Sequence, residues 1–97
     1  MERVVYLNNL YDYYKDLFTD KQKMYFEDYY WNNLSLSEIA DNNNVSRNAV
    51  HNQLKIIEER LEELESILKL SKKRDKILKI LKGNVDDVIL NKVIKNL

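Results

Sequence analysis

Apolar side chains recur every three or four residues along most of the chain, which is the spacing that places them on one face of an α-helix. The pattern predicts a first helix over about residues 4–18 and a second over about residues 21–31. The apolar stripe of the first helix consists of Val4, Leu7, Tyr11, Tyr14 and Phe18. No segment shows the alternation of apolar and polar residues that is typical of a half-buried β-strand. The sequence therefore predicts an all-α fold.

The middle of the chain, residues 35–54, has the pattern of a helix-turn-helix motif. Ser35 precedes Glu38 by three positions, which is the capping-box spacing that begins a helix. This helix is expected over about residues 36–41. Three asparagines at 42–44 then interrupt the apolar pattern, and asparagine tolerates the left-handed backbone of a sharp turn. We therefore expect two helices joined by a tight turn.

The helix after the turn is predicted to be long, running over about residues 47–70. Its apolar positions follow the four-three spacing of a heptad seam: Val50, Leu54, Ile57, Leu61, Leu64 and Leu68. Because such a seam needs an apolar partner, we expect a homodimer that associates through this helix and the C-terminal segment. The first helix of the same chain is an alternative cover for part of the seam. The acidic flank, expected to be solvated, comprises Glu58, Glu59, Glu62, Glu63 and Glu65.

The last part of the chain predicts a basic helical extension, residues 71–97, which follows a helix-turn-helix domain at residues 1–70. Ser71 is expected to cap a helix over residues 72–82, and Gly83 stands where a glycine commonly ends a helix. A final short helix is expected to turn five apolar side chains inward: Val85, Val88, Ile89, Val93 and Ile94.

Positive and negative charges are equal in number, 16 of each, but they are segregated along the chain. Residues 1–32 carry four Lys/Arg against six Asp/Glu, a net of −2. Residues 33–68 carry three against seven, a net of −4, and residues 69–97 carry nine against three, a net of +6. DNA-binding domains usually present a basic face, because neutralising phosphates supplies much of the affinity. Here the positive excess lies in the tail and not on the motif.

Composition narrows the class of protein. The chain has 97 residues, no proline, one glycine and no cysteine, which favours a single helical domain and excludes disulfides and thiolate metal sites. Its start, MERVVYLNNL, is too short and too mixed for a signal peptide, and no apolar run reaches membrane-spanning length. We therefore expect a cytoplasmic protein without membrane insertion. His51 is the only histidine, and no nucleophile–base pair or ligand cluster accompanies it, so we expect neither an enzyme nor a metal or other cofactor.

Donor-rich side chains gather on the exposed face of the helix that follows the turn. The candidate DNA-binding residues are Ser46, Arg47, Asn48, His51, Asn52 and Lys55. Arginine pairs with guanine and asparagine with adenine in the major groove, and the serine hydroxyl is expected to donate to a phosphate. The alternative interpretation of these residues is a solvated helix face.

Two further groups have alternative interpretations. The basic residues Lys72, Lys73, Arg74 and Lys76 are candidate auxiliary contacts to the phosphates of DNA or RNA. They equally suit three other roles. They can bind an acidic partner, or form the polar side of an amphipathic helix that covers a local core. They can also pair with the acidic helix of the same chain or of a second chain. The aromatic residues Tyr25, Phe26, Tyr29, Tyr30 and Trp31 are expected to pack mainly in the core, and the alternative is a stacking platform for single-stranded nucleic acid.

Two stretches carry a resemblance to a known family: TDKQKMYFEDYYWNNLSLSEIADNNNVSRNAVHNQL and the following EERLEELESIL. They resemble the YlxM-type small helix-turn-helix proteins, which are similar to region 4 of the primary bacterial sigma factors. The resemblance covers about residues 5–70, and its most specific elements are KQ at 21–22, YY at 29–30, SLSEIA at 35–40 and VSRNAV at 45–50. It implies a sigma-region-4-like bundle of the winged-helix-like superfamily that binds DNA. Because genes of the family typically neighbour those of the signal recognition particle, it also implies a link to that pathway.

The function that the sequence favours is that of a DNA-binding helix-turn-helix regulator acting as a homodimer. The alternative is a non-enzymatic adaptor that binds protein or RNA components of the protein-targeting machinery.

Overall fold

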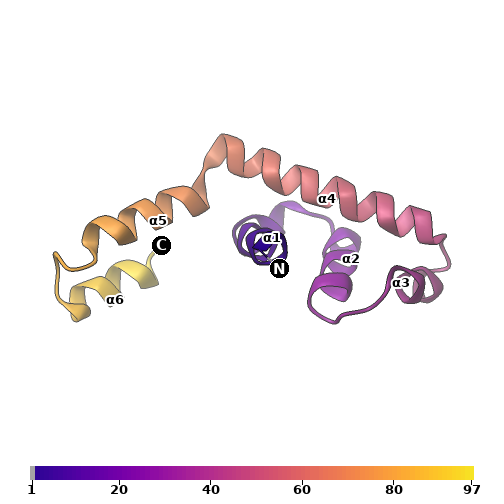
Figure 1. The fold of residues 1–97 in the computed structure, drawn as a ribbon, viewed down its shortest axis with the longest axis horizontal. Coiled ribbons are helices and arrows are strands. Elements are labelled where there is room, and N and C mark those ends of the chain that lie inside the picture. The colour runs from indigo at the N-terminus through magenta and orange to yellow at the C-terminus, as the bar shows by residue number, and fades with distance from the viewer. Residues whose placement is uncertain (1) are drawn as a thin grey trace.

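The computed structural model describes residues 2–97, and all of their regular structure is helical (Figure 1). The elements in chain order are α1 (Glu2–Tyr14), the short 3-10 helix η1 (Lys15–Leu17), α2 (Asp20–Tyr30), α3 (Leu36–Asn43), α4 (Arg47–Leu68), α5 (Leu70–Leu81) and α6 (Asp87–Lys95). No strand occurs among these residues, so the predicted all-α class is confirmed. None of the described helices is both long and apolar enough to span a bilayer.

Helix α4 is the central helix of the fold, and α1, α2 and α3 all pack against it (Figure 1). The buried face of α4 consists of Val50, Leu54, Ile57, Leu61 and Leu64. These are the heptad positions for which the sequence suggested a second chain. Helices of the same chain cover them, so the interpretation of these five positions as an intermolecular seam is wrong. Only Leu68, at the end of the seam, stays 41% exposed.

Aromatic side chains of α1 and α2 form the other half of the core. Tyr11 stacks on Phe26 with ring centroids 4.1 Å apart, and Phe26 contacts Tyr30 at 4.6 Å. Tyr25 and Phe26 are buried, whereas Tyr29 and Trp31 are exposed at the surface. The predicted core role is therefore confirmed for Tyr25, Phe26 and the half-buried Tyr30, but not for Tyr29 and Trp31. Val4 is the one member of the predicted α1 stripe that remains exposed.

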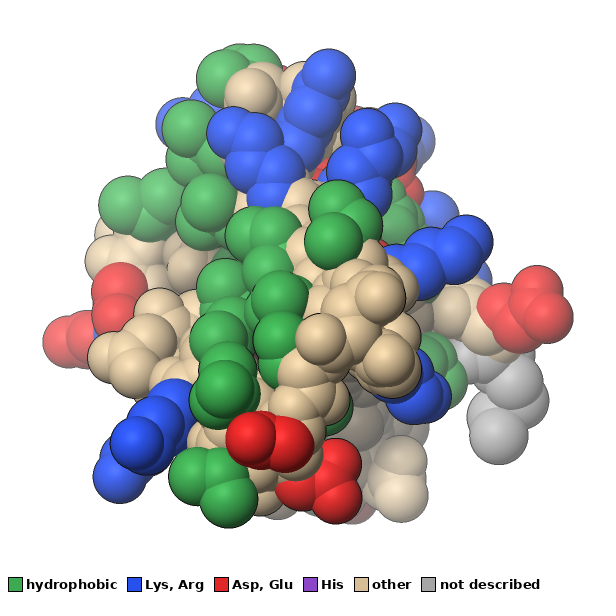
Figure 2. Space-filling model, turned by 90° about the vertical axis from the view of Figure 1, so that its left-hand side faces the viewer, with side chains coloured by type: hydrophobic (Ala, Val, Ile, Leu, Met, Phe, Trp, Pro, Cys, Tyr) green, Lys and Arg blue, Asp and Glu red, His purple; other side chains and the backbone are tan. Residues whose placement is uncertain are grey.

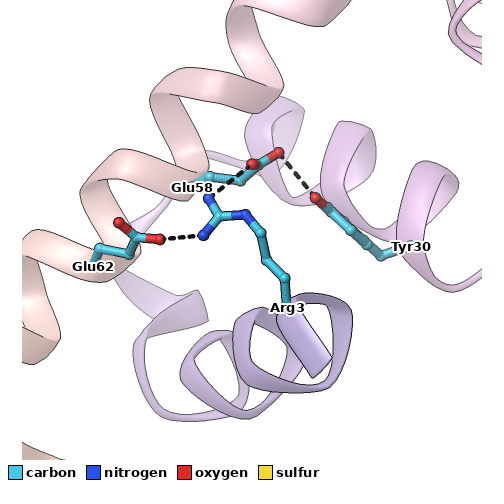
Figure 3. Close-up of polar contacts among 4 residues, drawn as sticks. All are labelled: Arg3, Tyr30, Glu58 and Glu62. Carbon is cyan, nitrogen blue, oxygen red and sulfur yellow. Dashed lines mark hydrogen bonds and ion pairs between the residues drawn. The ribbon is translucent and has the colours of Figure 1, made fainter. Parts of the chain in front are cut away.

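Three glutamates of the acidic row turn toward their own chain and do not simply face solvent. Arg3 of α1 donates to Glu62 at 2.7 Å and lies 3.5 Å from Glu58 (Figure 3). The Tyr30 hydroxyl donates to the other oxygen of Glu58 at 2.9 Å, and the Tyr14 hydroxyl donates to Glu65 at 2.7 Å. The sequence interpretation of the whole row as a solvated flank is thus wrong for Glu58, Glu62 and Glu65. These contacts tie α1 and α2 to α4 across its polar edge.

The junction between α4 and α5 differs from the prediction. Lys69 adopts a left-handed conformation, with φ 56°, and α5 begins at once at Leu70, so Ser71 does not cap the helix. The carboxylate of Glu65 takes the capping role, because it accepts the backbone N–H groups of Ser71 and Lys72, both at 3.2 Å. The Tyr14 hydroxyl completes the junction by accepting the N–H of Leu70 at 3.1 Å. A side chain of α1 therefore holds the bend between α4 and α5.

Beyond this bend, residues 69–97 form a hairpin of α5 and α6 that we call the C-terminal arm (Figure 1). Gly83 has φ 83° just after α5 ends, in agreement with its predicted role. Neither arm helix has a buried residue. The prediction that α6 turns its apolar side chains inward is wrong for Val88, Ile89 and Ile94, which are exposed because the arm extends away from the core.

Three buried or half-buried tyrosines predict a loss of stability at alkaline pH. Burial, and then a hydrogen bond to a glutamate, raises the pKa of Tyr11, Tyr14 and Tyr30 above the ordinary value. In the unfolded chain these phenols ionise near pH 10, while the folded chain retains their protons, so stability is full below about pH 10 and falls above it. Urea unfolding at a series of pH values should show a slope of up to about 1.4 kcal/mol per pH unit for each phenol. Tyr11→Phe should remove one phenol's share of the slope, and an unchanged slope would contradict this account.

Candidate nucleic-acid interface

The two helices of the central motif meet at a tight turn. Helix α3 ends at Asn43, and Asn44 takes the left-handed conformation with φ 54° and ψ 41°. The N–H of Val45 then bonds to the carbonyl of Ala40 at 3.1 Å, and Ala40 is buried where α3 packs on α4. The predicted asparagine turn is therefore confirmed, although the helix before it runs two residues further than expected.

The second helix of the motif begins as the sequence predicted. The Ser46 hydroxyl oxygen accepts the N–H of Ala49 at 3.0 Å, which makes Ser46 the N-cap of α4. A hydroxyl in this position still has its own hydrogen to donate. The backbone N–H groups of the first turn also point outward, and the helix dipole places partial positive charge at this end. The start of α4 is therefore suited to a phosphate group.

All the candidate base-reading side chains are exposed on the first turns of α4. They are Arg47, Asn48, His51, Asn52 and Lys55. None of them takes part in an ion pair within residues 2–97. The segment 47–55 extends about 12 Å along the helix axis. The structure thus presents one exposed donor surface without ion pairs, and the major groove of B-DNA is wide enough to admit an α-helix.

The electrostatic character of α4 changes beyond Lys55. The next turns carry five glutamates, of which Glu59 and Glu63 are exposed and point away from the core. An anionic duplex is repelled by these carboxylates, since like charges at short range disfavour contact. The first half of α4 is therefore compatible with an anionic partner, whereas the acidic half is not.

Two surface depressions flank the donor surface. One lies between the start of α2 and the first turns of α4, and its lining includes Lys21, Gln22 and Asn52. The Lys21 ammonium lies 5.8 Å from the centre of the Tyr25 ring. The other depression lies against α2 and α3, and His51 and Lys55 belong to its lining together with Glu58. The donor surface therefore lies between these two depressions, with Asn52 on one side and His51 and Lys55 on the other.

Lys21 and Gln22 were not among the residues selected from the sequence. They lie at the start of α2, inside the capping box formed by Thr19 and Gln22, and well before the motif in the chain. The KQ pair at 21–22 stood out only as an element of the family resemblance. A pattern confined to the motif does not reveal them, because tertiary packing brings α2 beside α4.

The auxiliary basic residues lie far from the donor surface. Lys72, Lys73 and Lys76 are exposed on α5, whereas Arg74 is half-buried and lines a groove with Tyr13. The whole of α4, about 33 Å long, separates them from Arg47 (Figure 1). The structure therefore does not unite the two predicted sets into one surface. Among residues 2–97 no group of acidic, histidine or cysteine side chains has a metal-site arrangement.

Comparison with known proteins identifies relatives along the whole chain. A family model described as "Putative helix-turn-helix protein, YlxM / p13 like" (UPF0122) matches residues 1–97. A UPF0122 protein of Malacoplasma penetrans is 49% identical over 78 residues, covering 77% of this chain and 73% of the relative. One of Halalkalibacterium halodurans is 42% identical over 89 residues, covering 89% and 82%. One of Fusobacterium nucleatum is 40% identical over 100 residues, covering 100% and 97%, so this similarity includes the C-terminal arm.

Proposed function

The chain belongs to the UPF0122 family of YlxM-like helix-turn-helix proteins, and on that premise we propose that it is a non-enzymatic, DNA-binding regulator. The observation that carries the proposal is the exposed, ion-pair-free donor surface at the start of α4, presented by a well-formed turn. In helix-turn-helix proteins the second helix enters the major groove with its first residues against the bases. The exposed first turns of α4 support this role for the present chain. Because DNA is the target, a cytoplasmic location is part of the proposal.

The roles of the individual residues follow from hydrogen-bonding capacity. Arg47 suits a bidentate contact to guanine, and Asn48 and Asn52 suit adenine, since their side-chain amides both donate and accept. The Ser46 hydroxyl donates to a phosphate beside the helix terminus, and His51 and Lys55 make secondary contacts. Lys21, across the depression from Asn52, adds a cation on the α2 side.

The arm lysines are proposed to add phosphate contacts that depend on ionic strength. Lys72 and Lys76 are exposed and lie four residues apart on one face of α5. Each neutralised phosphate adds about 0.9 to the slope of log affinity against log salt concentration, so Lys72→Gln with Lys76→Gln should flatten the slope by about two units. Fluorescence anisotropy with a labelled duplex, selected from a random pool by the wild-type protein, measures this slope.

The matched control removes two positive charges elsewhere. Lys15→Gln with Arg60→Gln produces the same change in net charge, but neither residue belongs to the donor surface or the arm. This control should keep the wild-type slope. Failure of the wild-type protein to enrich any duplex from the pool would reject the DNA-binding proposal itself.

The alternative function is an adaptor in the signal recognition particle pathway, which the YlxM resemblance implies. A pull-down from the host, divided into nuclease-treated and untreated halves, distinguishes the two functions. Partners that disappear with nuclease support the DNA-binding proposal. Protein partners that persist after nuclease treatment support the adaptor.

A further inference from the structure

The C-terminal arm exposes apolar surface that its own chain does not cover. The exposed apolar side chains of the arm are Leu70, Ile77, Ile80, Val88, Ile89, Ile94 and Leu97. Helices of 12 and 9 residues are marginal in water unless tertiary packing stabilises them. Helix α5 contacts α1 of its own chain near the junction, but neither arm helix has a buried residue. Most of the apolar area of the arm is therefore left for a further surface.

The size of the exposed surface fits a stable protein interface. The chain exposes 7,052 Å², whereas a compact monomer of 11.7 kDa exposes about 5,900 Å². The excess of roughly 1,200 Å² exceeds the 800 Å² or so that each partner of a standard interface buries. The radius of gyration, 16.7 Å, also exceeds the value of about 13 Å for a compact chain of this length.

The charge of the arm indicates what kind of surface it meets. The arm has a net charge of +6, and residues 1–68 have a net charge of −6. No ion pair among residues 2–97 joins an arm lysine to an acidic residue of the body. The junction held by Tyr14 and Glu65 directs the arm outward, so the chain does not neutralise itself. Figure 2 shows the arm end of the molecule, where lysine and arginine side chains border a band of hydrophobic ones. A second copy of the chain carries the complementary charge.

The outer face of α1 has the chemistry that matches the arm. Val5 is 57% exposed on this face. Tyr6, 44% exposed, lies at its edge, where it lines a depression with Lys69 and Lys72 of the same chain. Exposed carboxylates lie near Val5: Glu2 and Asp12 on α1, and Asp16 on the following η1. Asp16 also lies 3.9 Å from the Lys23 ammonium, and Asp12 lines a groove with Arg74 of the same chain. The only arginine of α1, Arg3, is engaged with α4 on another side of the helix (Figure 3). The 13-residue α1 and the 12-residue α5 have closely similar lengths, so one helix can lie along the other.

We propose that two copies of the chain exchange their C-terminal arms, so that the apolar and basic side of each arm packs on the outer face of the partner's α1. Such a contact is made twice around a two-fold axis, which closes the assembly as a dimer. The interface uses arm residues such as Ile80 and Val88 for apolar area, and Lys73 and Lys92 for attraction to the acidic border. It needs no nucleic acid, so it is tested separately from the proposed function.

The first test perturbs the most exposed apolar residues of the arm. Sedimentation velocity without nucleic acid should give the wild-type chain twice its mass of 11.7 kDa. Ile80→Glu with Val88→Glu, at positions 68% and 64% exposed, should weaken association by more than about 30-fold while circular dichroism stays unchanged. The control Ile56→Glu changes an exposed apolar residue of α4 outside the proposed interface and should still dimerise.

The second test exchanges charges between the two surfaces. Lys73→Glu with Lys92→Glu makes the arm less basic, and Glu2→Lys with Asp16→Lys reverses two of the three charges of the acidic border on α1 and η1. Each double variant alone should be monomeric at a concentration where the wild type is dimeric, because both of its contacts then join like charges. Their mixture should form a heterodimer, in which both contacts again join opposite charges.

Several outcomes overturn the arm exchange. A monomeric wild type at about 100 µM would do so, since a standard interface usually binds more tightly than this. If the variant Glu2→Lys with Asp16→Lys dimerises with the same dissociation constant as the wild type, the arms pack on each other and not on α1. A monomeric wild type whose arm binds phosphatidylserine vesicles, with binding lost in Ile80→Glu with Val88→Glu, would assign the arm to a lipid surface.

Discussion

Leu64→Glu is expected to unfold the chain, whereas Leu68→Glu, four residues later on the same helix, should leave it folded. Leu64 is 6% exposed in the core between α4 and the helices that cover it, so a carboxylate there loses water without gaining a partner. The cost of roughly 4 kcal/mol or more is comparable with the whole stability of a small domain. Leu68 is 41% exposed, so a carboxylate at this position can remain in contact with water. Far-UV circular dichroism with urea titration measures both variants.

The control for this comparison is Leu64→Met, which conserves volume and should cost less than about 1.5 kcal/mol. If Leu64→Glu yields a folded monomer from a wild-type dimer, the seam of α4 lies between chains. That result would restore the coiled-coil interpretation of the sequence and contradict the intramolecular core.

Arg47→Ala is expected to weaken specific DNA binding by about 5- to 150-fold, because a bidentate contact to a base contributes about 1–3 kcal/mol. Arg47 is exposed in the first turn of α4 and engages no acidic residue within residues 2–97, so the folded chain loses no ion pair. The loss should therefore appear in binding and not in thermal stability. Anisotropy titration with the selected duplex, alongside a melting curve, separates the two effects.

Arg60→Ala is the matched control, since Arg60 is an exposed arginine of the same helix beyond the segment proposed to enter the groove. It should bind within about twofold of the wild type, as expected for a residue outside the contact surface. An unchanged affinity for Arg47→Ala, combined with loss of binding in Lys72→Gln with Lys76→Gln, would show that the arm holds the nucleic acid. The motif would then be a scaffold, and the adaptor function would become the better explanation.

The local features of the fold were predictable from the sequence. Ser35 and Glu38 form the predicted capping box, with N···O distances of 3.1 Å in both directions. Ser46 caps α4, and Asn44 supplies the left-handed turn. These features depend on residues within four positions of one another, whose backbone preferences and hydrogen bonds act before any tertiary contact.

The partners of the long helix were not predictable in the same way. Periodicity identified the apolar face of α4 correctly, but it does not specify which surface covers that face. The heptad spacing suits a second chain as well as the three helices that fill the role here. The glutamates were misjudged for the same reason, because Arg3, Tyr14 and Tyr30 reach them from distant parts of the sequence.

By itself, the sequence determined the helical class, the position of the motif and the residue types on the exposed face of its second helix. Tertiary structure decided which of the basic residues belong together. It set Lys21 beside the start of α4 and placed the arm about 33 Å from Arg47. It also left the arm helices without a buried residue. The physical reason is range: caps and turns are settled by neighbours in the chain, whereas burial and the grouping of charges depend on which distant helices pack together.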